Sequence, residues 1–285
     1  MAIGDISLTS AMRSNLVSLQ STESLLGRTQ ERLSTGKRVN SAIDNPTNFF
    51  AARAHTQRAS LLDGLKDSIG EGIQTVKAAD NAVTAINTLI EGLRGVVTQA
   101  RSALSSTTSA TELSGLKDQY NELIKQINNI VTDAQYKGVN FLTSAATLTV
   151  NFNEQASTTL IMSGFSGSTS GLAISGGSFS GAGTITSAVM DTSGELNNIE
   201  TTLNTALATL RTESAKLSAN LTILSTRQDF IKNTVNTLLD GAGKLTNADT
   251  NEEGANMLLL QTRQQLGVTS LSLASQTAQS VLRLF

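Results

Sequence analysis

The sequence is poor in the residues that most enzyme sites require. Among 285 residues it has no cysteine, no tryptophan, one histidine and one proline. The lack of cysteine excludes disulfides, thiolate zinc sites, iron–sulfur clusters and a cysteine nucleophile. A single histidine does not assemble a Ser-His-Asp triad or a multi-histidine metal site. The composition therefore predicts a structural protein that is not an enzyme and that uses no cofactor and no metal.

Charge and aromatic rings are also scarce. The formal net charge is −2 and only 15% of residues are charged, so no basic patch favours nucleic acid or an anionic membrane. Aromatic residues make up 4%, so the core must consist of Leu, Ile, Val and Ala. Residues 264–282 carry no charge, but half of them are polar, which argues against a membrane span and favours packing among protein helices.

Apolar residues recur every seven positions along both halves of the chain. Met12, Leu19, Leu26 and Leu33 form one series, and Leu196 begins another that continues to Leu238. Sustained heptads predict long helices packed as a coiled coil, and the second series alone spans about 64 Å at 1.5 Å per residue. The residues expected in the core of this rod are Val76, Val83, Ile90, Val97, Leu207, Leu221 and Val235.

Turn and cap residues mark the expected helix ends. Gly36 is typical of a helix C-cap, and Asp44 or Asn45 before Pro46 is typical of the cap at a helix start. Residues 240–243 (Asp-Gly-Ala-Gly) are expected to end the long C-terminal helix, and residues 249–251 (Asp-Thr-Asn) are expected to cap the last helix.

The middle of the chain differs from both halves. Residues 143–192 are rich in Ser, Thr and Gly, and they contain no Lys or Arg. Alternation over 148–152 and 159–162 predicts two short strands. The predicted fold class is therefore mainly α, with long terminal helices and a small β-rich insertion.

Several segments at both ends of the chain resemble the conserved segments of one known protein family. Residues 30–42 (QERLSTGKRVNSA) are similar to the family segment QRLSSGxRINSA, and 135–142 (QYKGVNFL) to TQFNGxxL. Residues 67–74 and 79–83 resemble NANDGIS and TAEGAL, 245–249 (LTNAD) resemble IEDAD, and 279–285 (QSVLRLF) resemble QxVLxLL. The chain therefore resembles bacterial flagellin, and the resemblance covers residues 1 to about 142 and about 193 to 285.

The resemblance implies a subunit of the flagellar filament, in which the two chain ends pair in an inner tube. It implies an inner-tube segment at 1–44, rod segments at 45–142 and 193–244, a surface insertion at 143–192 and a second inner-tube segment at 245–285. The ends are expected to fold on polymerisation, because helices stabilised mainly by neighbours are marginal alone. Assembly contacts are expected at Leu16, Leu19, Leu26, Leu33, Leu260, Leu271, Val281, Leu282 and Phe285.

The family also implies partners and a location. The partners are further copies of the chain, an export chaperone, the filament cap and the hook–filament junction proteins. Export to the extracellular filament is expected through the type III apparatus, since the N-terminus resembles no cleaved signal peptide. The alternatives are a hook–filament junction protein of the same superfamily and a secreted adhesin. Candidate glycosylation sites in the insertion are Ser163, Ser166, Ser168 and Thr169.

One family segment is known to be recognised by animal innate immunity, with the pattern LQRVRELAVQ. This chain has IEGLRGVVTQ at 90–99, so Gly92 replaces an arginine and Val96 a leucine, while Arg94 is kept. Gln119 stands where such members have glutamate. Loss of an arginine removes five hydrogen-bond donors, so weak or absent receptor activation is expected.

Overall fold

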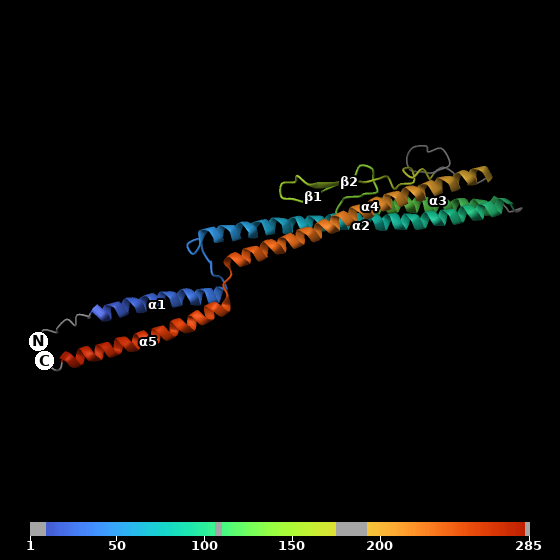
Figure 1. Ribbon diagram of the computed structural model, residues 1–285. Coiled ribbons are helices and arrows are strands. Elements are labelled where there is room, and N and C mark those ends of the chain that lie inside the picture. The colour runs from blue at the N-terminus through green and yellow to red at the C-terminus, as the bar shows by residue number, and fades with distance from the viewer. Residues whose placement is uncertain (1–9, 106–109, 175–192, 283–285) are drawn as a thin grey trace. The chain divides into compact units, whose positions relative to one another are not determined.

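The computed structural model describes residues 10–105, 110–174 and 193–282. These residues form five helices and one two-stranded antiparallel sheet (Figure 1). The mainly α fold with a small β insertion confirms the predicted class. The elements are α1 (Ser10–Thr35), α2 (Pro46–Ser105), α3 (Ala110–Asp133), β1 (Thr147–Asn151), β2 (Thr159–Ser163), α4 (Ser193–Thr246) and α5 (Thr250–Leu282).

The chain divides into two compact units. The terminal unit comprises residues 1–59 and 236–285, and the central unit comprises residues 60–235. Helices α2 and α4 contribute residues to both. Among the described residues, none of the helices is apolar over a stretch long enough to cross a bilayer.

In the terminal unit α1 and α5 pack as an antiparallel pair. The first described residue of α1 and the last of α5 lie at the same end of the pair (Figure 1). At the opposite end the two connectors are hydrogen-bonded to each other. The amides of Arg38 and Val39 donate to the Thr246 carbonyl at 2.7 and 3.1 Å, and the Ala248 amide donates to the Gly36 carbonyl at 2.9 Å.

The caps of three helix ends confirm the sequence predictions. Helix α1 ends at Thr35, and Gly36 follows with a φ of 67°, a conformation that glycine adopts without steric cost. The side chain of Asn45 accepts from the Asn48 amide at 3.0 Å, which caps α2, and Pro46 is its first residue. Asp249 likewise accepts from the Asn251 amide at 2.9 Å and caps α5.

The predicted end of the long C-terminal helix at residues 240–243 is wrong. Helix α4 continues through Gly241 and Gly243 to Thr246. A glycine inside a helix costs only about 1 kcal/mol, and here no proline forces a stop. The helix ends instead where the Thr246 carbonyl binds the amides of the α1–α2 connector.

The core of the central unit lies between α2, α3 and α4. Ile86, Ile90 and Leu93 of α2 are fully buried, as are Ile127 of α3 and Leu203 of α4. Polar contacts fix the register of α2 against α4. The Asp80 carboxylate accepts from Ser214 at 3.1 Å, and Arg101 donates to Glu200 at 2.7 Å and to Asn197 at 2.9 Å.

The predicted strands are confirmed as a hairpin that packs on the helices. In β1 and β2, Val150 and Met162 are buried, whereas Ile161 on the opposite face is exposed. A Cβ at Gly72 of α2 would lie 3.1 Å from Val150, so the absence of a side chain there lets β1 approach the helix. The Arg227 guanidinium lies 5.1 Å from the Phe152 ring centroid and adds a cation–π contact.

Gly164 at the end of β2 has no room for a side chain. A Cβ there would lie 2.5 Å from the Thr143 carbonyl oxygen and 2.7 Å from that of Phe141. Because both are backbone atoms, we expect Gly164→Ala to displace the hairpin at a cost of roughly 1–3 kcal/mol, lowering the Tm by roughly 3–10 °C. Calorimetry of the purified monomer measures this.

The matched control is Gly115→Ala in α3, where an added Cβ meets nothing within 4 Å. That change favours the helix and leaves the Tm unchanged or slightly higher. If Gly164→Ala and the unchanged chain had equal Tm values, the hairpin would tolerate the added carbon.

Candidate assembly site

One line of residues on α5 faces α1. Glu253, Leu260 and Gly267 follow each other at intervals of seven. The Glu253 carboxylate lies 3.0 Å from the Arg32 guanidinium, and Leu260 is 7% exposed. A Cβ on Gly267 would lie 2.7 Å from Leu19 Cδ1, so the two helices approach closely at this glycine. We call these three residues the inner line of α5.

The ion pair between Arg32 and Glu253 joins residues far apart in the chain. The Glu253 side chain is 8% exposed, and the Arg32 side chain 30%. Glu253 lies in the first turn of α5, where the helix dipole also stabilises an acidic side chain. A carboxylate this buried needs its partner, because an unpaired buried charge is strongly unfavourable. The pair therefore fixes the register of α5 against α1.

A second apolar stripe runs along another side of α5, about 100° around the helix from the inner line. Leu259, Leu266 and Leu273 also follow each other at intervals of seven, and they are 51%, 64% and 60% exposed. We call them the outer stripe. Leu258, next to Leu259, is also more than half exposed, as is Val268 on another side of α5. Large apolar side chains that line up on one surface usually mark an interface.

Helix α1 also presents apolar side chains to solvent. Leu16, Val17, Leu25 and Leu33 are exposed, whereas Met12 is buried and Leu19 and Leu26 are half-buried. The seven-residue series of α1 thus turns partly toward α5 and partly away from it. Both helices of the pair retain uncovered apolar surface.

The predicted assembly residues divide between these two sides. Leu16 and Leu33 are exposed, while Leu19, Leu26 and Leu271 are half-buried and Leu260 is buried within the terminal unit. Phe285 and the side chains of Val281 and Leu282 lie outside the described residues. Sequence reasoning missed the outer stripe, although its seven-residue spacing is visible in the sequence.

The residues predicted for the rod core lie mostly at the centre of the helical bundle. Leu221 and Val235, however, are half-buried, and Leu221 lines a surface groove with Ile73 and Lys77. Polar Ser214 and Gln228 alternate with them along α4, which leaves this seam less completely covered. The fully buried members of the predicted set are Val76, Val83, Ile90, Val97 and Leu207.

The hydroxyls predicted as glycosylation candidates differ in accessibility. Ser163 is exposed at the end of β2, and Ser166 and Ser168 are half-buried and 3.0 Å apart. Thr169 does not suit a modification site. It is 2% exposed, and its backbone amide and side-chain hydroxyl lie within 3.2 Å of the Asn128 side chain.

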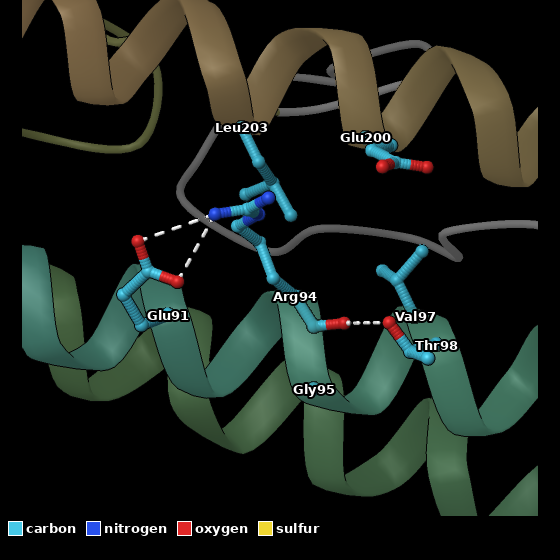
Figure 2. Close-up of a pocket in the computed structure, with 7 residues that line it drawn as sticks. All are labelled: Glu91, Arg94, Gly95, Val97, Thr98, Glu200 and Leu203. Carbon is cyan, nitrogen blue, oxygen red and sulfur yellow. Dashed lines mark hydrogen bonds and ion pairs between the residues drawn. The ribbon is translucent and has the colours of Figure 1, made fainter.

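The α2 segment that corresponds to the immune-recognised pattern borders a small notch against α4. Figure 2 shows Arg94 turned toward Glu91, and its Nη1 donates to both carboxylate oxygens at 3.1 and 3.3 Å. Gly95 forms part of the floor, and Glu200 and Leu203 of α4 line the other side. The guanidinium is thus already paired on its own helix.

Within residues 10–105, 110–174 and 193–282, no group of three or more His, Asp or Glu side chains is placed to hold a metal ion. What the described residues do present is long helices with an uncovered apolar stripe. These features are characteristic of a structural subunit that packs against further copies.

Comparison with known proteins identifies the family. Residues 6–147 match the bacterial flagellin N-terminal helical region, and residues 196–285 match the bacterial flagellin C-terminal helical region. The chain belongs to the bacterial flagellin family, whose members are structural subunits of the flagellar filament. The hook–filament junction alternative is not favoured by these matches.

Relatives match over the full length. Flagellin FljK of Caulobacter vibrioides is 30% identical over 286 residues, covering 100% of both chains. A flagellin of Brucella melitensis is 29% identical over 95% of both chains. A crystal structure of Bacillus cereus flagellin has a TM-score of 0.46 at 18% identity, covering 57% of this chain and 88% of that one.

Proposed function

We propose that this chain polymerises through the uncovered sides of α1 and α5, with the outer stripe of α5 buried between neighbouring subunits. The outer stripe is the observation that carries this proposal. Its three leucines are each more than half exposed in the single chain, while the inner line is already occupied by α1. Two apolar sides on one helix require two sets of neighbours, and one chain supplies only one set.

In the proposed filament, residues 1–44 and 245–285 line the inner tube. Residues 45–142 and 193–244 form the rod, and residues 143–192 face solvent with Ser163 as the accessible glycosylation candidate. Subunits join head to tail with a rotation that does not close, which produces a helix rather than a ring. Since α1 and α5 leave apolar surface uncovered, their helices gain most of their stability on polymerisation.

The test is electron microscopy of purified monomer after addition of ammonium sulfate, an excluded salt that strengthens apolar burial. We expect long helical filaments, and none from a variant that lacks residues 264–285. Circular dichroism of the truncated variant checks that the remaining helices are kept. If the intact protein stays monomeric at every salt concentration below precipitation, the proposal is contradicted.

We further propose the partners and route that the family implies. These are an export chaperone, the filament cap and the hook–filament junction proteins, with type III export to an extracellular filament. The role is structural, without catalysis. Co-purification of the chain with its chaperone from cells blocked in export tests the first partner.

We expect weak or absent activation of the animal receptor that reads the segment at residues 90–99. Gly92 offers no guanidinium, and Arg94 is held by Glu91 on its own helix. A reporter-cell assay with purified monomer measures the response.

The triple variant Gly92→Arg, Val96→Leu and Gln119→Glu brings three positions back to the family residues and should raise that response. A response of the unchanged chain equal to that of an enteric flagellin would contradict this expectation.

A further inference from the structure

A groove with an apolar floor and a basic rim lies at the connector end of the terminal unit. Val39, Ala52 and Ala242 are buried in its floor, and Phe49 is half-buried beside them. Lys37 of the α1–α2 connector and Arg53 of α2 lie on the rim. The groove therefore suits a segment that combines apolar side chains with a negative charge.

The two rim cations have no acidic partner among the described residues. Three acids of the terminal unit are engaged in other contacts. Glu253 pairs with Arg32, and Asp249 caps α5. Asp44 accepts from the amides of Ser41 and Asn40 at 2.9 and 3.1 Å, and these hydrogen bonds lower the pKa of its carboxyl group.

These contacts also hold the groove in shape. The Asp44 side chain fixes the connector between α1 and α2, and the amides of Arg38 and Val39 bind the carbonyl at the end of α4. Little ordering of the backbone is then required when a ligand binds.

We propose that this groove binds residues 1–9 of a second copy of the chain, with Asp5 between the two rim cations. Residues 1–9 (MAIGDISLT) contain one charged side chain, Asp5, flanked by Ile3 and Ile6. The apolar side chains of residues 1–9 suit the apolar floor of the groove, and the negative charge of Asp5 suits its positively charged rim. The inference rests on the proposed polymerisation and specifies one of its contacts.

The occupant cannot come from the same chain. Helix α1 has 26 residues, which separates residue 10 from the groove by about 39 Å at 1.5 Å per residue. A fully extended stretch of nine residues spans at most about 32 Å. Residues 1–9 thus reach only the groove of another copy, and the contact joins opposite ends of two terminal units. Such a contact is head to tail and does not close on itself.

Disulfide trapping tests the contact, because the chain has no cysteine of its own. Asp5→Cys and Arg53→Cys are made as separate variants, mixed in equal amounts with reductant, polymerised and then oxidised. We expect disulfide-linked dimers in filaments and none in monomers at low salt. The control mixture pairs Asp5→Cys with Thr222→Cys, an exposed position on α4 of the central unit.

If filaments form but give no more disulfide-linked dimer than the control mixture, the proposed contact is wrong while polymerisation is established. Failure of the unchanged chain to polymerise would instead refute the proposed function. A double variant with both cysteines that links within single monomers would also overturn the assignment to a second copy.

Charge exchange provides a measurement that does not depend on cysteine chemistry. Arg53→Glu and Asp5→Arg should each raise the critical concentration for polymerisation roughly twofold to fivefold, which is the effect of one exposed ion pair. The double variant should return the critical concentration to that of the unchanged chain. Lys125→Glu on α3 is the matched charge reversal, with no change expected. No recovery in the double variant would contradict the pairing of Asp5 with the groove.

Discussion

Replacing the outer stripe of α5 with polar residues should abolish polymerisation. The triple variant Leu259→Ser, Leu266→Ser and Leu273→Ser removes apolar surface that is exposed in the single chain. The loss should therefore fall on assembly rather than on folding. At about 25 cal/mol per Å² the three changes cost roughly 3–5 kcal/mol per subunit, which raises the critical concentration more than about a hundredfold. Sedimentation of polymer after salt addition measures it.

The matched control replaces the same three leucines with methionine, which keeps the volume and the apolar character. This variant should polymerise within a few-fold of the unchanged chain. Normal filaments from the serine variant would show that the outer stripe remains in contact with water in the assembled protein, and the proposed interface would be wrong.

A side chain at Gly267 should also weaken assembly, for a different reason. Its Cβ would lie 2.7 Å from Leu19 Cδ1, so Gly267→Val forces α5 away from α1 or displaces Leu19. Overpacking of this kind costs roughly 1–3 kcal/mol, and the critical concentration should rise about 5-fold to 150-fold. Leu19→Ala in the same chain creates room for the added carbons and should recover most of the loss.

Gly254→Ala is the control, because an added Cβ there meets nothing within 4 Å although the residue lies on the same helix. Recovery of Gly267→Val by Leu19→Ala is the result that a general loss of helix stability does not produce. If the double variant is worse than the single one, the close approach of the two helices at Gly267 is not the cause.

The sequence permitted most of the fold to be predicted. Local sequence determines the helix periodicity, the strand alternation and the caps at Gly36, Asn45 and Asp249. These features can therefore be predicted without a structure. The end of α4 was predicted wrongly because Gly241 and Gly243 permit a turn but do not require one. The hydrogen bonds that do end the helix come from Arg38 and Val39, about two hundred residues away.

The assembly site was harder to predict. Leu259 and Leu260 are adjacent and equally apolar, yet one is 51% exposed and the other 7%. A helix turns about 100° per residue, so neighbouring leucines point to different sides of α5. Periodicity reveals that both lines exist but does not say which one α1 covers. That depends on long-range contacts, such as the Arg32–Glu253 ion pair and the fit of Leu19 at Gly267.

The two sides of α5 also differ in how mutations accumulate over generations. A change on the inner line, such as one at Gly267, meets Leu19 of the same polypeptide, so one further mutation in that gene compensates it. A change on the outer stripe alters every copy of the subunit at once, and each changed stripe meets a surface of a different copy. In a cell with several flagellin genes whose products mix in one filament, we expect the outer stripe to stay compatible among the paralogues. The inner pairs are free to drift together within each gene.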